Sequence, residues 1–170
     1  NIIKMNKYGL FAITAVGILA ADQLTKYWID SSMAIHDTIP VLSGFFSITY
    51  VRNPGAAFGF LAGASPAFRY TFFIMVNMIA IALILAYIRK AGKKESGMIL
   101  GLSLIMAGAV GNLIDRIRFG EVVDFLDFYI GSIHWPAFNV ADSSISVGAF
   151  FLIWELWKQG RENHRLSNPT

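Results

Sequence analysis

The chain has no cysteine among its 170 residues. This absence excludes disulfide bonds, thiol nucleophiles and cysteine-ligated metals. Charge is scarce as well, because only 15% of the residues are Asp, Glu, Lys or Arg while 55% are hydrophobic. The mean hydropathy is +0.55. A soluble domain of this length seldom carries so little charge, so we predict a membrane protein with one domain over residues 1–170.

Other chemistries also lack the residues that they need. The three histidines, His36, His134 and His164, are scattered, and no serine stands in a nucleophile-elbow motif. We therefore expect no serine–histidine catalysis, no bound metal, no cofactor and no nucleic-acid partner. No internal repeat or low-complexity segment is present.

Four apolar segments are long enough to cross the hydrocarbon core of a bilayer. They cover residues 8–28, 70–88, 98–114 and 140–157. The third segment has small residues four apart, at Gly97 and Gly101 and again at Ala107 and Gly111, a spacing that allows helices to pack closely. The sequence thus predicts a mainly α membrane protein with four transmembrane helices.

The basic residues predict the orientation of these helices. Nine of the fourteen Lys and Arg residues lie in three places. These are the N-terminus (Lys4, Lys7), the connection after the second segment (Arg89, Lys90, Lys93, Lys94) and the C-terminus (Lys158, Arg161, Arg165). Four spans put these places on one side, which the positive-inside rule makes cytoplasmic. Loops 29–69 and 115–141 then face outward.

The two outer loops contain strand-like segments. Residues Phe45–Val51, Val122–Phe125 and Ile133–Trp135 are rich in aromatic and β-branched side chains, so we predict a small extramembrane β-sheet on the outer side. Residues Arg52–Gly55 have turn chemistry. The apolar segment Ala56–Phe60 follows, and we expect it to close over a bound substrate as a lid.

Four aspartates lie close together between Gly111 and Asp142, at the edge of the predicted membrane. They are Asp115, Asp124, Asp127 and Asp142. Charged side chains are costly there and are kept mainly for function. Two adjacent carboxyls share one proton, and such a pair can hydrolyse a peptide bond without metal, cysteine or serine. The residues alone do not select the pair, although we leave Asp127 out of it and expect that residue at the surface or at the rim of the site.

Structural roles are open for the polar residues around these acids. Asp22 and Lys26 are one helical turn apart and are expected to form an ion pair at the outer end of the first span. Asn53 suits a turn. Asn139 is a candidate N-cap for the fourth span, with Asp142 three residues later.

Asn112, Asp115 and Arg116 share one face if the third helix continues. Asp115 and Arg116 are then candidates for a polar clamp at the end of that helix.

Five ordered motifs carry a resemblance to a known family. They are Asp22-Gln23-Leu24-Thr25-Lys26, Asn53-Pro54-Gly55-Ala56-Ala57-Phe58-Gly59, Gly111-Asn112-Leu113-Ile114-Asp115-Arg116, Gly120-x-Val122-Val123-Asp124-Phe125 and Phe138-Asn139-Val140-Ala141-Asp142. With these motifs the chain resembles the bacterial lipoprotein signal peptidases (signal peptidase II), polytopic aspartyl proteases of the inner membrane. The resemblance covers the chain from about Lys7 to Trp157.

The resemblance implies roles for the residues in these motifs. Asp124 and Asp142 would be the catalytic dyad. Four residues would support it: Asn53, Asn112, Arg116 and Asn139. Three would be structural polar residues: Asp22, Lys26 and Asp115.

The resemblance also implies a substrate and a location. The substrate would be a diacylglyceryl-modified prolipoprotein, cut on the N-terminal side of the lipidated cysteine, and globomycin-like peptides would inhibit at the dyad. The protein would lie among the lipids of the bacterial inner membrane, with both termini cytoplasmic and the active site at the outer face.

Two other functions remain open from the residues alone. One is a small transporter that uses the carboxylates to bind cations or protons, although the lack of an internal repeat argues mildly against it. The other is a lipid-head-group enzyme with aspartates as Mg²⁺ ligands.

Overall fold

The computed structural model describes residues 6–55, 61, 63–92 and 95–167. The predicted lid, Ala56–Phe60, lies outside these residues, so it stays a prediction.

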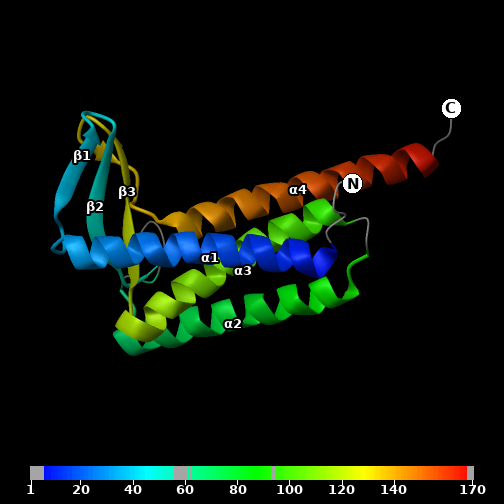
Figure 1. The fold of residues 1–170 in the computed structure, drawn as a ribbon, viewed down its shortest axis with the longest axis horizontal. Helices are drawn as coiled ribbons and strands as arrows, with labels where there is room; N and C mark the ends of the chain where they lie inside the picture. Colours follow the sequence, from blue (N-terminus) through cyan, green and yellow to red (C-terminus); the bar gives the residue numbers. More distant parts are fainter. Residues whose placement is uncertain (1–5, 56–60, 62, 93–94, 168–170) are drawn as a thin grey trace.

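Four long helices form a bundle, and a small sheet covers one end of it (Figure 1). The helices are α1 (Lys7–Ser32), α2 (Pro66–Lys90), α3 (Ser96–Phe119) and α4 (Val140–Ser167). Each of the four contains a stretch that is long and apolar enough to cross a membrane. The described start of α1 and the described end of α4 both lie at the end of the bundle away from the sheet.

Local sequence sets the ends of the helices. The Asn6 side chain caps α1 and the Ser65 side chain caps α2, where Pro66 occupies the first turn. Helix α3 ends at Phe119 and is capped by Gly120, whose φ of 77° is the left-handed conformation that glycine adopts most readily.

Four helix ends differ by four residues or more from the predicted spans and loops. Helix α1 continues to Ser32, α2 already begins at Pro66, and α4 continues to Ser167, ten residues beyond the predicted span. Helix α3 continues to Phe119, so residues 115–119 are helical and do not belong to a loop. Their charges had suggested the end of the apolar segment, but Asp115 and Arg116 are buried and bonded inside the protein.

Helix α3 is the most buried of the four helices and packs between the others. Small residues allow this. A Cβ on Gly108 would collide with the backbone oxygen of Ala141 in α4, and one on Gly111 would collide with the carboxylate of Asp22 in α1. The expected close approach along this face is therefore present.

The sheet is antiparallel, with the order β1-β2-β3-β4. Its strands are β1 (Thr38–Leu42), β2 (Phe46–Asn53), β3 (Val122–Ile130) and β4 (Ile133–His134). Three of them overlap the predicted strands, whereas β1 was not predicted. Strand β2 also runs through Arg52 and Asn53, which had been assigned to a turn. An apolar cluster of Ile29, Tyr50, Val123 and Phe125 fastens the sheet to the end of α1.

Candidate active site

The predicted site residues come together where the sheet meets the helices. Asp124 lies on β3, and Asp142 lies in the first turn of α4. Asn53 ends β2, Asn112 projects from α3, and Asn139 immediately precedes α4. Residues that are far apart in the sequence thus meet at one end of the bundle.

Asp124 is enclosed by two amide donors. Its side chain is 1% exposed. The Asn53 Nδ2 donates to Asp124 Oδ2 at 2.9 Å, and the Asn139 Nδ2 donates to Asp124 Oδ1 at 2.7 Å. Each carboxyl oxygen therefore accepts one hydrogen bond, which fixes the plane of the group.

Asp142 is held by a neighbouring helix and by its own helix start. The Asn112 Nδ2 donates to Asp142 Oδ1 at 2.8 Å. The backbone N–H of Asp142 donates to Asn139 Oδ1 at 2.8 Å, so the predicted N-cap is confirmed. Asn139 thus caps α4 with its oxygen and holds Asp124 with its nitrogen.

Lys26 fixes the orientation of the Asn112 amide. The Lys26 Nζ donates to Asn112 Oδ1 at 3.0 Å, and the Asn139 Nδ2 donates to the same oxygen at 3.3 Å. Because an ammonium group can only donate, the oxygen of Asn112 faces Lys26 and its NH₂ group is left for Asp142. One chain of bonds therefore links both acids.

Lys26 is also the centre of a buried ion cluster. Its Nζ lies 3.0 Å from Asp22 Oδ2 and 2.8 Å from Asp115 Oδ2, and all three side chains are at most 3% exposed. The predicted Asp22–Lys26 pair is confirmed. The predicted clamp between Asp115 and Arg116 is wrong, because Asp115 instead pairs with Lys26.

The cluster joins four elements of the fold. Asp22 accepts from the backbone N–H of Ala141 in α4 at 2.8 Å. Asp115 accepts from the backbone N–H of Val123 in β3 at 3.2 Å. Such a buried ion cluster is retained when all its polar atoms find partners, and here it ties α1, α3, α4 and β3 together.

Arg116 fastens the turn after β2. Its Nη2 donates to the backbone oxygen of Gly55 at 3.0 Å, and its guanidinium carbon lies 4.6 Å from the centre of the Phe73 ring in α2. Arg116 thus places α2 and the turn after Asn53 beside the two acids.

Burial shifts the titration of Asp124. Loss of water around the carboxyl, and next the negative charge of Asp142, raise its pKa to about 7, against the opposing effects of Asn53, Asn139 and Lys26. Near neutral pH, Asp124 can therefore hold or release a proton.

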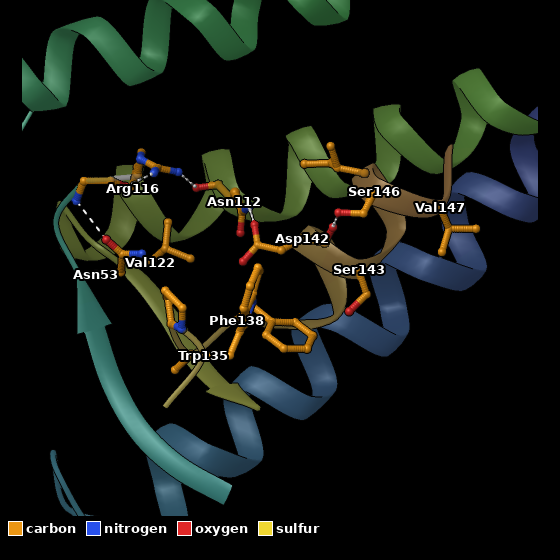
Figure 2. Close-up of a pocket in the computed structure, with 14 residues that line it drawn as sticks. Asn53, Asn112, Arg116, Val122, Trp135, Phe138, Asp142, Ser143, Ser146 and Val147 are labelled. Atoms are coloured by element: carbon orange, nitrogen blue, oxygen red, sulfur yellow. Dashed lines mark hydrogen bonds between the residues drawn. The ribbon is translucent and has the colours of Figure 1, made fainter. Parts of the chain in front are cut away.

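A cavity of about 650 Å³ opens beside Asp142. In Figure 2, Asn112 lies next to Asp142, and the rings of Trp135 and Phe138 form another part of the wall. Ile145 and Val147 of α4 continue the apolar lining. Asp124 does not line the cavity, since it lies behind the amide of Asn53, which does.

Asp127 is buried, so the prediction that it lies at the surface is wrong. It is 6% exposed, accepts from Thr49 Oγ1 at 3.0 Å and contacts His134 Nδ1 at 2.9 Å. It lies three residues along β3 from Asp124, and its partners Thr49 and His134 belong to β2 and β4. Across the described ranges, no three His, Cys, Asp or Glu side chains are grouped in a way that could hold a metal ion.

No role was predicted for Gln23, which the structure places among the buried acids. Its Nε2 donates to Asp22 Oδ2 at 3.1 Å and to Asp115 Oδ1 at 3.3 Å. The only signal was its place between Asp22 and Lys26. Trp135 had been assigned only to a strand, and nothing in the sequence indicated that its ring would line a cavity.

Comparison with known proteins decides the family. A model of the family described as signal peptidase (SPase) II matches residues 14–158. The chain belongs to the signal peptidase II family. The resemblance found in the sequence motifs is thus confirmed.

Curated relatives of this signal peptidase II member agree with that assignment. The lipoprotein signal peptidase of Syntrophus aciditrophicus (strain SB) is 54% identical over 153 residues, which cover 90% of this chain and 95% of the relative. That of Geobacter sulfurreducens is 48% identical over 154 residues, covering 91% and 95%.

Solved structures agree with the fold. A bacterial membrane enzyme superposes with a TM-score of 0.80 at 39% identity, covering 89% of this chain and 90% of the other. A second one gives 0.78 at 37% identity, covering 87% and 92%. The predicted fold class, a multi-pass α-helical membrane protein with a small antiparallel sheet, is confirmed.

Proposed function

We propose that this chain is an aspartic lipoprotein signal peptidase, which removes signal peptides from prolipoproteins, and that Asp124 and Asp142 are its catalytic dyad. One observation carries the assignment of residues. Two carboxyls from different elements are joined through Asn112 and Asn139. Asp142 lines a largely apolar cavity, and Asp124 lies behind the Asn53 amide in its wall.

The dyad would work with one shared proton. The ionised carboxylate takes a proton from water, whose oxygen attacks the scissile carbonyl carbon, while the protonated carboxyl gives its proton to the carbonyl oxygen. Collapse of the tetrahedral intermediate breaks the C–N bond, and the leaving amine receives the proton taken from water. The raised pKa of Asp124, about 7, suits a group that exchanges protons near neutral pH.

Asn53, Asn112 and Asn139 would hold the two carboxyls in the reacting geometry through the hydrogen bonds described above. Arg116 would keep the turn at Gly55 in place beside the scissile bond. Asp22, Lys26 and Asp115 have structural roles in this scheme, because they join the elements that carry the dyad.

The substrate would be a diacylglyceryl-modified prolipoprotein, cut on the N-terminal side of the lipidated cysteine. The apolar walls at Trp135, Phe138 and Val147 suit the signal peptide of this substrate, while the acyl chains on its lipidated cysteine stay in the surrounding lipid. Globomycin-like peptides would compete for the same cavity at the dyad.

The protein would lie in the bacterial inner membrane with both termini cytoplasmic and the site at the outer face. One observation, read with the positive-inside rule, supports this. The basic clusters at Arg89–Lys90 and at Lys158–Arg161 lie at the end of the helices away from the sheet, and the positive-inside rule assigns that end to the cytoplasm.

The test is a gel-shift cleavage assay with purified enzyme and a diacylglyceryl-modified precursor, with and without EDTA. We expect cleavage of the lipidated precursor in both conditions, and none of the same precursor without its lipid. The Asp142→Asn variant serves as the inactive control. Loss of cleavage in EDTA and its recovery with Mg²⁺ would favour a metal enzyme, and ion flux without cleavage would favour a transporter.

A further inference from the structure

A second polar cluster lies on the face of β2 that is turned away from the cavity. The Tyr50 hydroxyl and the Arg52 Nη2 each donate to Asp30 Oδ1 at 2.5 Å, and the Arg52 Nε donates to the Tyr50 hydroxyl at 2.7 Å. The guanidinium carbon of Arg52 lies 3.9 Å from the centre of the Phe119 ring. We call these four residues the Arg52 brace.

The brace joins three elements near the site. Asp30 belongs to the last turns of α1, Tyr50 and Arg52 to β2, and Phe119 ends α3. The Arg52 side chain is 14% exposed and the Tyr50 residue 2%, so water screens these bonds only in part. The fork of an arginine and its stacking on a ring are features that lysine cannot reproduce.

The brace follows an irregularity in the sheet. Ile48 pairs with Leu126 and Val51 pairs with Asp124, so β2 has two residues between these pairs where β3 has one. One of the two, Tyr50, turns its backbone away from β3: its N–H donates to Asp37 and its oxygen accepts from His36. This is a β-bulge, a feature that often re-aims a side chain next to an active site.

A bulge interrupts the ladder of hydrogen bonds between two strands. The pairing of Phe46–Ile48 with β3 therefore determines only weakly the register of the residues that follow the bulge. Only Val51, Arg52 and Asn53 pair with β3 beyond this point. Neighbouring residues in a strand point to opposite faces, so a slip by one residue would turn Asn53 away from the cavity. Some other contact must therefore set the register of these three residues.

We propose that Arg52 is a positioning residue for the dyad: through Asp30, Tyr50 and Phe119 it fixes the register of β2 beyond the bulge and so holds the Asn53 amide against Asp124. The proposal rests on the proposed function in so far as Asp124 is catalytic. Its geometric content, the position of Asn53, can be measured without any substrate.

The Asn53 amide is well placed to report a shift of the strand. Its oxygen accepts from the backbone N–H of Gly55 at 3.0 Å, which leaves its NH₂ group to donate to Asp124. That donation lowers the pKa of Asp124, so its loss must raise the pKa further. The other groups that face Asp124 are Asp142, Lys26, Arg116 and Asn139, and none of them belongs to the brace.

The experiment titrates the Asp124 carboxyl by carbon-13 NMR of aspartate-labelled protein in detergent micelles. The variants Arg52→Lys and Tyr50→Phe change no charge, so a shift in them cannot come from a lost charge at position 52. We expect both to raise the Asp124 pKa, in the same direction as Asn53→Ala. In the double variant Arg52→Lys with Asn53→Ala, the pKa should equal that of Asn53→Ala alone, because both changes remove the same bond.

The matched control is Arg118→Lys, which also keeps the charge. Arg118 is exposed, and its guanidinium carbon also lies over the Phe119 ring, 4.6 Å from the ring centre, but it is not part of the Arg52 brace. We expect no change of the Asp124 pKa in this variant. An unchanged pKa in Arg52→Lys and Tyr50→Phe, an unchanged pKa in Asn53→Ala, or shifts that add in the double variant would each overturn the proposal.

Turnover separates this proposal from the proposed function. In Arg52→Lys, kcat should fall by roughly 10- to 100-fold, as for a group displaced by about 1 Å, while KM changes little. If the wild type cleaves the precursor and Arg52→Lys has the same kcat, the positioning role of Arg52 is contradicted but the proposed function is not. A wild type that cuts no lipidated precursor would contradict the proposed function, and the titration would still decide the role of Arg52.

Discussion

At the scale of single residues, the two acids differ in their surroundings. Asp124 accepts one amide N–H on each oxygen and is almost fully buried, whereas Asp142 lines the cavity and accepts from Asn112 on one oxygen. A water molecule in the cavity therefore meets Asp142 more directly than Asp124. Both groups depend on asparagine amides whose oxygens are already occupied, so the amides can only donate to the acids.

The first prediction is that Asp124→Asn and Asp142→Asn each abolish cleavage of the lipidated precursor while leaving a folded protein. An amide can neither take up nor release the shared proton, so the loss should exceed about 10³-fold, the order that general acid–base catalysis supplies. Cleavage rates and thermal unfolding in detergent measure the two parts of the prediction. Near-normal turnover in either variant would refute the assignment of the dyad.

The second prediction concerns pH. The pKa of Asp124 is raised to about 7, so above this pH the pair loses its shared proton and kcat should fall. A carboxyl whose pKa is raised in the folded state stabilises that state at low pH, and this contribution is lost as the pH rises through about 7. Unfolding scans of the wild type should therefore show lower stability at high pH.

Asp124→Asn provides the comparison for this pH effect. The variant has no group to titrate at this position, so its stability should change less between about pH 5 and about pH 8 than that of the wild type. Parallel slopes for the two proteins would mean that the Asp124 pKa is near its ordinary value.

Local contacts could be predicted from spacing, and distant ones could not. The Asp22–Lys26 pair and the Asn139 cap follow from positions one helical turn apart. The partner of Asp115 could not be predicted, because Lys26 reaches it only through the packing of α1 on α3. For the same reason the residues alone did not favour Asp142 over Asp115 as the partner of Asp124, and the family resemblance supplied that choice.

At the scale of helices and strands, α3 determines how closely the others approach. Gly101 and Gly108 face α4, and Gly111 faces Asp22 of α1. In a bilayer, close backbone approach replaces the hydrophobic effect as the main source of helix–helix attraction. The site depends on this packing, since Asn112 reaches Asp142 only if α3 and α4 are in contact at their sheet ends.

The third prediction is that Gly108→Ala destabilises the protein by about 1–3 kcal/mol, the usual range for an overpacked interior. The new Cβ would collide with the backbone oxygen of Ala141, which cannot move without shifting the start of α4 and with it Asp142. Thermal unfolding in detergent and the rate of cleavage should both fall.

Gly17→Ala is the matched control for Gly108→Ala. Gly17 also lies within a spanning helix, but a Cβ there would meet nothing within 4 Å. Alanine should be neutral or slightly stabilising at this position. Equal destabilisation by both changes would show that glycine matters for α3 in some way other than close packing.

The elements were predictable where the sequence is apolar and regular. The spans stood out by length, but the end of α3 did not, because Asp115, Arg116 and Arg118 interrupt the apolar pattern although the helix continues to Phe119. Strand β1 was missed because it is short, contains Pro40 and is exposed along its whole length. Such an edge strand has no buried face and therefore no alternating pattern to detect.

At the scale of the whole molecule, the chain is polarised along the bundle. The sheet, the two acids and the cavity lie at one end, and the start of α1 and the end of α4 lie at the other. The side chain of Lys7 donates to the backbone oxygens of Arg89 and Ala91, at 3.1 and 2.6 Å, and so ties α1 to the end of α2 away from the site. Lys7, Arg89 and Lys90 thus lie together at the end that we assign to the cytoplasm.

The last prediction tests this assignment. Reporter fusions after Lys94 and after Lys158 should read cytoplasmic, whereas fusions at Ser43 and Ile130 should read external. Ser43 and Ile130 lie at the sheet end, in the turn between β1 and β2 and at the end of β3. In the sequence, Lys94 stands between the α2 and α3 segments, and Lys158 belongs to α4, on the part of that helix away from the sheet. The expectation depends on the positive-inside rule, which counts the Lys and Arg residues near the helix ends. External readings at Lys158 together with cytoplasmic readings at Ser43 would show that the protein has the opposite orientation. The two acids would then face the cytoplasm, where a precursor translocated across the membrane cannot reach them.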